Sequence, residues 1–369
     1  MKSRLFVVDD ASLASTLSSN IASVKIPSFQ GDKWIKTIFD IMADMIQIEI
    51  GDYIFLWNQR SSLHSSCVYG VFRAISRPYY QCSSPNDTFP FKIHIEPAYE
   101  LQNPVSEYEI LNNPYIKNPL WNIIGKKVSG KPRGSTPLTI DESQYLISLL
   151  LDKNKTYRFI PADATRNITI PFPLKIDYSL AVKNSRPVSV SLFNPNKLSP
   201  FSPKRELLYE KELEALFNQE FLNKNSSFFS QLDININNVC WYSNYLPYSI
   251  ERKEMDYVII ESYDNLAPSL ISVIEFSINP IDEDHINKVF MYSKWVSQTL
   301  ALGTANVQPI IISKSSVDFI NGEKAPTKKN RLQQLSTLIT NYENDYPLRR
   351  LKIYAYDFKT SVPKFILKR

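Results

Sequence analysis

Residues 254–278 read EMDYVIIESYDNLAPSLISVIEFSI, two apolar runs separated by a polar loop that contains a proline. Short apolar runs between turn residues predict two neighbouring buried strands. Each run carries an acid, Asp256 near the start of the first and Glu275 inside the second. A carboxylate among apolar neighbours costs free energy unless it is paired or binds a cation, so the two acids predict a functional site.

Oxygen ligands from adjacent strands suit Mg²⁺, which accepts one or two carboxylates and completes its shell with water and phosphate oxygens. We therefore expect Asp256 and Glu275 to bind Mg²⁺. Such an ion activates water and stabilises the leaving oxygen when a phosphodiester bond is hydrolysed. The alternative is that Glu275 faces solvent on an edge strand.

The region around the two acids has a regular order of elements. It predicts a helix, three strands, a helix, a strand, a helix and a strand, at residues 204–223, 238–245, 255–261, 270–278, 282–302, 307–313, 330–342 and 351–358. This order resembles the PD-(D/E)xK nuclease superfamily over residues 204–313, most closely its RecB-type and NucS-type branch. The resemblance implies a mixed-sheet nuclease core whose first helix supplies a further carboxylate, here Glu214 or else Glu212.

One position departs from that family's pattern. The family's third strand carries Glu-x-Lys, but residues 273–277 read VIEFS and place Ser277 at the lysine position. A cation beside the acids orients the attacking water and offsets charge on the phosphate. Lys288 lies four residues before Tyr292, where the family's next helix often has Gln-x-x-x-Tyr, so we expect Lys288 to supply it. The alternatives are a surface lysine and a nuclease fold that has lost activity.

The first part of the chain predicts a helix over residues 32–45 and strands over 53–57, 67–74 and 91–96. Residues 48–57 (IEIGDYIFLW) and 68–76 (VYGVFRAIS) resemble the EVE, YTH and PUA-like group of small β-barrel domains. The resemblance implies a reader domain over residues 1–155 that holds a flipped, modified base in an aromatic cage. The candidates for base binding are Trp57, Tyr69, Trp34 and Tyr80. Each of them could instead belong to the hydrophobic core.

The net charge of +5 is unevenly distributed. Residues 156–203 hold 6 basic and 2 acidic side chains and seven prolines, which predicts a basic linker. Residues 110–140 hold five basic side chains and no acid. Such segments could follow a phosphate backbone, and the expected contacts are Arg73, Arg77, Lys126, Lys127, Lys131 and Arg133. Ordinary solvated surface charge is the alternative.

Several classes of function are excluded by what the sequence lacks. Neither GxGxxG nor GxxxxGK[ST] occurs, so a Gly-rich nucleotide-binding loop is not expected. The 3 Cys and 3 His show no zinc-ligand spacing. No apolar run approaches the roughly 18 residues of a membrane span, and we expect a cytoplasmic protein without membrane contact.

Together these patterns predict a two-domain α/β (α+β) protein with a PUA-like β-barrel at residues 1–155, a linker at 156–203 and a nuclease domain at 204–369. We expect a Mg²⁺-dependent endonuclease that cuts double-stranded DNA carrying a modified base, in restriction or antiviral defence. Cutting both strands needs two active sites, so a homodimer is expected during cleavage. The alternatives are an endonuclease that reads unmodified bases, a non-catalytic nucleic-acid-binding protein, and RNA in place of DNA.

Overall fold

The computed structural model divides the chain into two compact units, Met1–Leu192 and Phe193–Arg369. The residues that it describes are 2–26, 31–60, 65–81, 88–112, 122–123, 135–160, 186–187, 210–248, 253–262, 270–314, 325–357 and 364–369. Each unit has its own sheet, and each is described by itself.

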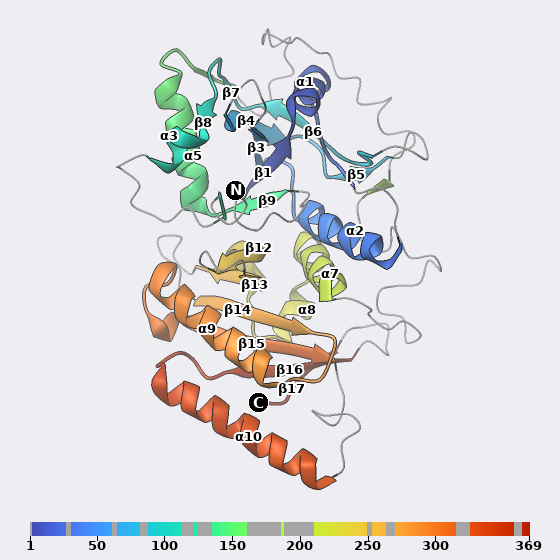
Figure 1. Ribbon diagram of the computed structural model, residues 1–369, viewed down its shortest axis with the longest axis vertical. Helices are drawn as coiled ribbons and strands as arrows, with labels where there is room; N and C mark the ends of the chain where they lie inside the picture. The colour runs from blue at the N-terminus through green and yellow to red at the C-terminus, as the bar shows by residue number, and fades with distance from the viewer. Residues whose placement is uncertain are drawn as a thin grey trace. The chain divides into compact units, whose positions relative to one another are not determined.

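The first unit is a mixture of short strands and helices (Figure 1). Its elements are β1 (Ser3–Val8), α1 (Asp10–Ser19), β2 (Ile21–Val24), α2 (Gly31–Ile46), β3 (Tyr53–Asn58), β4 (Cys67–Ala74), β5 (Tyr79–Tyr80), β6 (Phe91–Pro97), β7 (Tyr99–Glu100), β8 (Val105–Ser106), α3 (Glu107–Leu111), β9 (Thr136–Leu138), α5 (Ile140–Lys153), β10 (Arg158–Phe159) and β11 (Arg186–Pro187). The helix and the three strands that the sequence predicts here are confirmed to within a residue or two.

The strands of the first unit form a nine-stranded sheet in the order β11-β5-β6-β4-β3-β1-β9, with β2 added beside β6 and β8 beside β4. β1 and β3 run parallel, and the other pairs are antiparallel. Among the described strands this path has β11 and β9 at its two ends, so the sheet of the predicted β-barrel domain is not paired end to end. The pairing of edge strands depends on long-range packing, which the local strand pattern does not encode.

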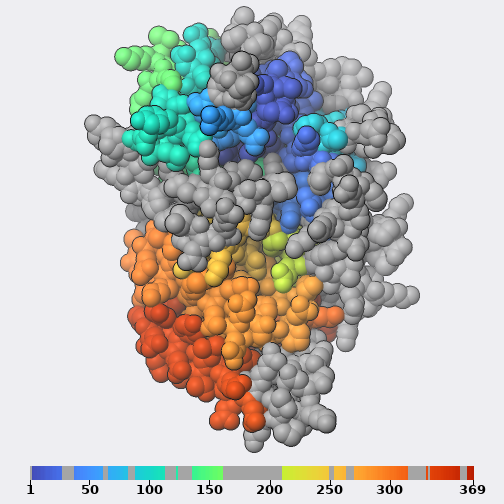
Figure 2. Space-filling model, in the orientation of Figure 1, coloured from blue at the N-terminus to red at the C-terminus, as the bar shows by residue number. Residues whose placement is uncertain are grey.

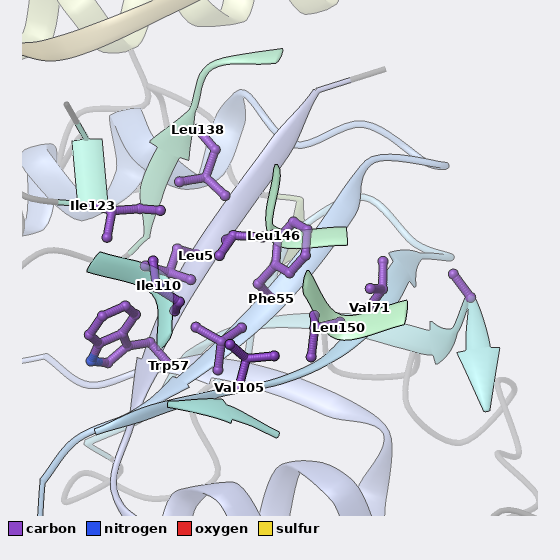
Figure 3. Packing of buried hydrophobic residues seen from close by; sticks show 12 residues of the cluster. Leu5, Phe55, Trp57, Val71, Val105, Ile110, Ile123, Leu138, Leu146 and Leu150 are labelled. Carbon is purple, nitrogen blue, oxygen red and sulfur yellow. The ribbon is translucent and has the colours of Figure 1, made fainter. Parts of the chain in front are cut away.

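The core of the first unit lies between this sheet and α5 (Figure 3). α5 begins at a capping box, in which Thr139 and Glu142 satisfy each other's backbone N–H groups. From there Leu146 and Leu150 pack against Leu5 and other strand residues. The buried Glu142 also accepts hydrogen bonds from the backbone N–H groups of residues 122 and 123, which ties a distant segment to the helix.

The described parts of the segment predicted as a linker belong to the first unit. Strand β10 pairs with β7, and Ile160 is fully buried. Strand β11 pairs with β5. The first unit therefore extends beyond the predicted boundary at residue 155, because these short strands find partners that lie more than 50 residues away.

The second unit has the predicted elements in the predicted order, with a further short helix after the first one, two 3₁₀ turns and a further strand at its end. They are α7 (Glu210–Leu222), α8 (Ser226–Ser230), a 3₁₀ turn (Ile236–Asn238), β12 (Val239–Tyr248), β13 (Lys253–Glu261), β14 (Leu270–Ser277), α9 (Glu283–Thr299), a second 3₁₀ turn (Thr304–Asn306), β15 (Val307–Lys314), α10 (Ala325–Asp345), β16 (Lys352–Asp357) and β17 (Lys364–Leu367). The sheet order is β12-β13-β14-β15-β16-β17.

This sheet is mixed, and helices cover both of its faces. β14, β15 and β16 are parallel neighbours, so each step between them needs a crossover helix, first α9 and then α10. α9 and α10 pack over Ile311 on one face (Figure 1). On the other face, Phe217 of α7 contacts the rings of Tyr257 and Phe276. The α+β class with a mixed sheet is thus confirmed for this unit.

Candidate active site

Asp256 and Glu275 lie side by side on the central strands of the second unit. The antiparallel register pairs Tyr257 with Ile274. Asp256, one residue before Tyr257, therefore stands opposite Glu275, one residue after Ile274, and the two side chains lie on the same face. Glu275 also pairs with Ile311, which lies under α9 and α10. The two predicted acids therefore meet on the helix-covered face, and Glu275 is 5% exposed rather than turned to solvent on an edge strand.

The two carboxylates are held in an environment that disfavours their charge. Burial raises the pKa of Glu275, and the neighbouring charges of Asp256 and Glu210 raise it further, against a smaller opposing effect of Lys288. Burial also raises the pKa of Asp256, while Lys211 and the N–H of Phe276 act in the opposite direction. That N–H donates to Asp256 Oδ2 at 2.9 Å and fixes the carboxylate between the strands.

Lys288 reaches this pair from α9. Its Nζ lies 3.7 Å from Glu275 Oε1 and 2.8 Å from Asp284 Oδ2. Burial disfavours the charged ammonium, but the hydrogen bond that it donates to Asp284 and the charge of Glu275 outweigh burial and raise the pKa of Lys288. The structure therefore brings a charged lysine to the acids, at the place that the sequence predicted.

Ser277 stands where the PD-(D/E)xK pattern has a lysine, and it has a structural role there. Its side chain is fully buried, its Oγ donates to the carbonyl of Asn279 at 2.9 Å, and it accepts from the N–H of Asn279 at 3.1 Å. A hydroxyl that closes a turn in this way leaves the cation to come from another element. Lys288 on the following helix is the cation that the structure places beside Glu275.

The helix carboxylate that acts on the two acids is Glu210, not the predicted Glu214. Glu214 is fully buried, and it is bound by Lys211 Nζ at 2.5 Å and by Asn244 Nδ2 at 3.1 Å. Glu210 lies one helical turn earlier, and burial and the charge of Asp256 raise its pKa. The spacing of four residues puts both glutamates on one helix face, so Glu210 was an equally available choice in the sequence.

His285 also lies close enough to affect the charges of the acids, although no sequence pattern singles it out. It sits in the first turn of α9, where it forms a capping box with Asp282, and its Nδ1 lies 2.6 Å from Asp282 Oδ1. Its charged form lowers the pKa of both Asp256 and Glu210. Its position follows from the start of α9 over the sheet, which only the folded chain reveals.

The donor set fits Mg²⁺ better than a metal held by side chains alone. Across the part of the chain that the structure describes, no three His, Cys, Asp or Glu side chains are grouped as a metal-ligand set. Asp256 and Glu275 are a pair of carboxylates, and Mg²⁺ is commonly bound by one or two carboxylates together with water and substrate phosphates. Burial raises the pKa of both carboxyl groups, and a bound divalent cation would favour their charged forms.

Glu275→Gln is expected to stabilise the metal-free chain at alkaline pH. The pKa of Glu275 is raised above its ordinary value of 4.5, so the folded state binds a proton that the unfolded chain has released. Stability therefore falls as the pH rises above about 4.5, and the amide removes that loss. We expect a gain of about 1–3 kcal/mol at pH 8 in EDTA and none below pH 4.

Urea unfolding at the two pH values measures this gain. Asp284→Asn is the matched control, because the Asp284 side chain is 70% exposed and close to the same lysine. A gain for Glu275→Gln that is equal at both pH values would contradict the assigned cause.

The predicted aromatic cage does not assemble in the first unit. Trp57 is 5% exposed and belongs to the core cluster (Figure 3). It pairs with Val68 across the β3–β4 ladder, so Tyr69, the next residue, points to the opposite face of the sheet. Tyr80 is half-buried and packs edge-on against Phe91. Burial of the strand aromatics explains the difference, and the side chain of Trp34 lies outside the described residues.

The residues predicted to contact the nucleic-acid backbone differ in their surroundings. Arg73 is 4% exposed and donates to Glu96 at 2.9 and 3.1 Å, so it serves the fold rather than a phosphate. Arg77 is exposed. The remaining four basic residues lie outside the described residues: Lys126, Lys127, Lys131 and Arg133.

A different group of aromatic side chains is exposed on the first unit. The ring of Tyr99 lies 5.9 Å from that of Tyr157 and 5.3 Å from that of Phe159, and we call these three residues the Tyr99 cluster. Tyr157 and Phe159 are 46% and 50% exposed. Arg158 lies between them in the chain and 3.6 Å from Glu100. In the sequence, two aromatic residues flank an arginine at positions 157–159. This pattern could have indicated the cluster, but it falls in the segment predicted as a linker.

No protein-family model and no curated protein sequence matches the chain. Solved structures with partial likeness include a hypothetical protein from Leishmania major (TM-score 0.31, 8% identity, 42% of this chain and 96% of that one). Another is human THYN1 in complex with DNA containing 5-methylcytosine (TM-score 0.28, 13% identity, 40% of this chain and 97% of that one). A third is the YTH domain-containing protein mmi1 with RNA (TM-score 0.26, 13% identity, 41% of this chain and 85% of that one). TM-scores this low do not establish a shared fold.

None of the described helices is both long enough and apolar enough to cross a membrane.

Proposed function

We propose that the chain is a Mg²⁺-dependent endonuclease that hydrolyses phosphodiester bonds in DNA, with its active site on the second unit. The observation that supports this proposal is the meeting of Asp256, Glu275 and Lys288 on one face of the mixed sheet. Two half-buried to buried carboxylates beside a cation form the donor set that metal-assisted phosphodiester hydrolysis needs.

Each residue has a separate part in this reaction. Asp256 and Glu275 would hold the ion, and bound Mg²⁺ would supply Lewis-acid stabilisation of the phosphoryl oxygen and a water of lowered pKa. Lys288, 3.7 Å from Glu275, is in position to donate a hydrogen bond to the attacking water or to a phosphate oxygen. Asp284 holds the ammonium at 2.8 Å and keeps it protonated, and the N–H of Phe276 keeps the Asp256 carboxylate oriented.

We further propose that the first unit selects the cleavage site by holding a flipped, modified base against the Tyr99 cluster. Tyr157 and Phe159 present accessible ring faces, which stacking on a base requires. The Arg158 side chain is 59% exposed beside them and could contact the neighbouring phosphate. An enzyme of this design would serve restriction or antiviral defence and would act as a homodimer to cut both strands.

The second candidate function is nucleic-acid binding without catalysis. Ser277 favours it, because the residue is buried in a turn where the family's lysine would stand. The two candidates differ in their response to a divalent cation, since only the endonuclease needs one for a covalent change in its substrate.

Incubation of matched supercoiled plasmids with the full chain tests the proposal. One plasmid is unmodified and the other carries modified cytosines, and each is incubated with Mg²⁺ and with EDTA. Cleavage of the modified plasmid in Mg²⁺ alone is the expected result. Equal cleavage of both plasmids would remove the modified-base selection, and binding without cleavage in any divalent cation would favour the second candidate.

Lys288→Gln is expected to reduce the cleavage rate about 100-fold, because it removes a cation next to Glu275 while leaving the helix intact. The measurement is the single-turnover rate on the modified plasmid at saturating Mg²⁺. Lys368→Gln, which removes an exposed lysine beside β17 at the opposite edge of the sheet, is the control for a general loss of positive charge. Equal rate losses in the two variants would contradict a specific role for Lys288.

A further inference from the structure

A groove of about 560 Å³ lies on the second unit and reaches the active-site lysine. α9 supplies most of its lining residues, from Asp284 and Lys288 to Gln298 farther along the helix. Residues at the ends of β12 and β13 and residues near the end of α10 complete the lining. Orange and red atoms, the colours of the segments that contain α9 and α10, lie at the surface of this unit in Figure 2.

The charge of this groove is positive. Its lining contains three lysines and one acid, Asp284, which is already bound by Lys288 at 2.8 Å. Lys253 and Lys294 are exposed, and they come from different elements, β13 and α9. A phosphate backbone complements such a surface, because each phosphate that a lysine neutralises releases a condensed counterion.

Aromatic rings line the same groove as these lysines. Tyr248 lies 6.2 Å from the ring of Trp295, and Tyr342 lies 6.1 Å from that of Tyr346. Lys294 Nζ lies 4.4 Å from the centre of the Tyr346 ring, which holds the ammonium at the groove wall. Aromatic faces with interleaved cations are the surface on which unpaired bases stack.

The rings and lysines of the groove favour a single strand over a duplex. In a duplex the base faces are covered by their neighbours, so ring stacking against protein requires bases that are unpaired or turned out. Lys288 lines the groove, and its Nζ lies 3.7 Å from Glu275, so a strand bound in the groove passes close to the carboxylates.

We propose that this groove binds a single-stranded segment of the nucleic acid next to the bond that is cut, with bases against Tyr248 and phosphates beside Lys253 and Lys294. The inference rests on the proposed function, because it assigns the groove to the strand that the carboxylates would cleave. The substrate of the second unit is then a strand that is already unpaired or that is opened near the cut, rather than a fully paired duplex.

Fluorescence anisotropy with the full chain in EDTA tests the binding without cleavage. The probes are labelled oligothymidylate and oligouridylate of about 12 nucleotides and a fully paired hairpin of similar length. We expect Lys253→Gln/Lys294→Gln to weaken oligothymidylate binding about tenfold and to reduce its salt slope by about 1.4, as two lost phosphate contacts require. We expect Tyr248→Leu to weaken it by a similar factor with the salt slope unchanged.

Lys368→Gln is the matched control, because it removes an exposed lysine beside β17 on the opposite edge of the sheet. Retained single-strand affinity in the double variant, or an equal loss of hairpin affinity, would overturn the inference. The uridylate arm shows whether the groove accepts both sugar types, and weaker binding of both single strands than of the hairpin would also overturn it.

Cleavage in Mg²⁺ separates this inference from the proposed function. If no probe is cut but single-strand binding depends on the groove lysines, the proposed function fails and the binding groove stands. If the fully paired hairpin is cut and the double variant cuts as fast as the wild type, the groove assignment fails and the endonuclease stands.

Discussion

Asp256→Asn is expected to slow Mg²⁺-dependent cleavage by at least about 1000-fold. The substitution keeps the shape of the side chain, and an amide oxygen can still accept the N–H of Phe276 that Asp256 Oδ2 accepts at 2.9 Å. What it removes is one of the two carboxylates that stand opposite each other on β13 and β14. The loss should therefore appear in catalysis and ion binding rather than in folding.

Two measurements on the full chain check this result. The first is the single-turnover cleavage rate on the modified plasmid. The second is the rise in melting temperature on addition of Mg²⁺, which we expect for the wild type and not for Asp256→Asn, because an ion that binds the folded state alone stabilises it.

Glu261→Gln is the matched control for Asp256→Asn. Glu261 is a buried acid at the other end of the same strand, where it accepts the N–H of Asn235 at 3.1 Å. Its substitution disturbs a buried carboxylate of β13 without touching the proposed ion site. A full cleavage rate in Asp256→Asn, or the same loss in both variants, would contradict the assignment of the active site.

Trp57→Ala is expected to destabilise the first unit by about 3–5 kcal/mol. Trp57 is 5% exposed and packs in the cluster that contains Leu5 and Leu146, so truncation leaves a large cavity among residues held by both the sheet and α5. Trp57→Phe should cost less than about 1.5 kcal/mol, since it keeps most of the ring volume. A cage residue would show the reverse pattern, with a loss of base binding and little loss of stability.

Urea unfolding of the full chain, followed by circular dichroism, measures the cost of the Trp57 substitutions. Tyr157→Ala is the comparison, because the side chain is 46% exposed and should change stability by less than about 0.5 kcal/mol. That variant should instead weaken binding to modified DNA if the Tyr99 cluster reads the base. An unchanged unfolding curve for Trp57→Ala would contradict the core assignment.

The elements of the second unit could be predicted because their signals are local. The apolar runs of β13 and β14 and the helical spacing of α9 repeat over a few residues, and each predicted element is present to within a few residues where the structure describes it. The placement of Lys288 also followed from spacing, since a residue four positions before Tyr292 shares its helix face.

The choice between equivalent residues could not be predicted in this way. Glu210 and Glu214 occupy the same face of α7, and their roles differ because Lys211 and Asn244 bind Glu214. Asn244 comes from β12, more than 20 residues away. A helical pattern predicts which residues share a face, but the side chains that bind those residues come from other parts of the chain.

By itself the sequence determined the order of helices and strands, the pair of acids on adjacent strands and the missing lysine at Ser277. The tertiary structure alone decided that Trp57 and Arg73 are buried parts of the fold, and that Tyr99 meets Tyr157 and Phe159 at the surface. The physical reason is the range of the interactions involved. Secondary structure depends on neighbours within a few residues, whereas burial and side-chain pairing depend on which distant segments the sheet brings together.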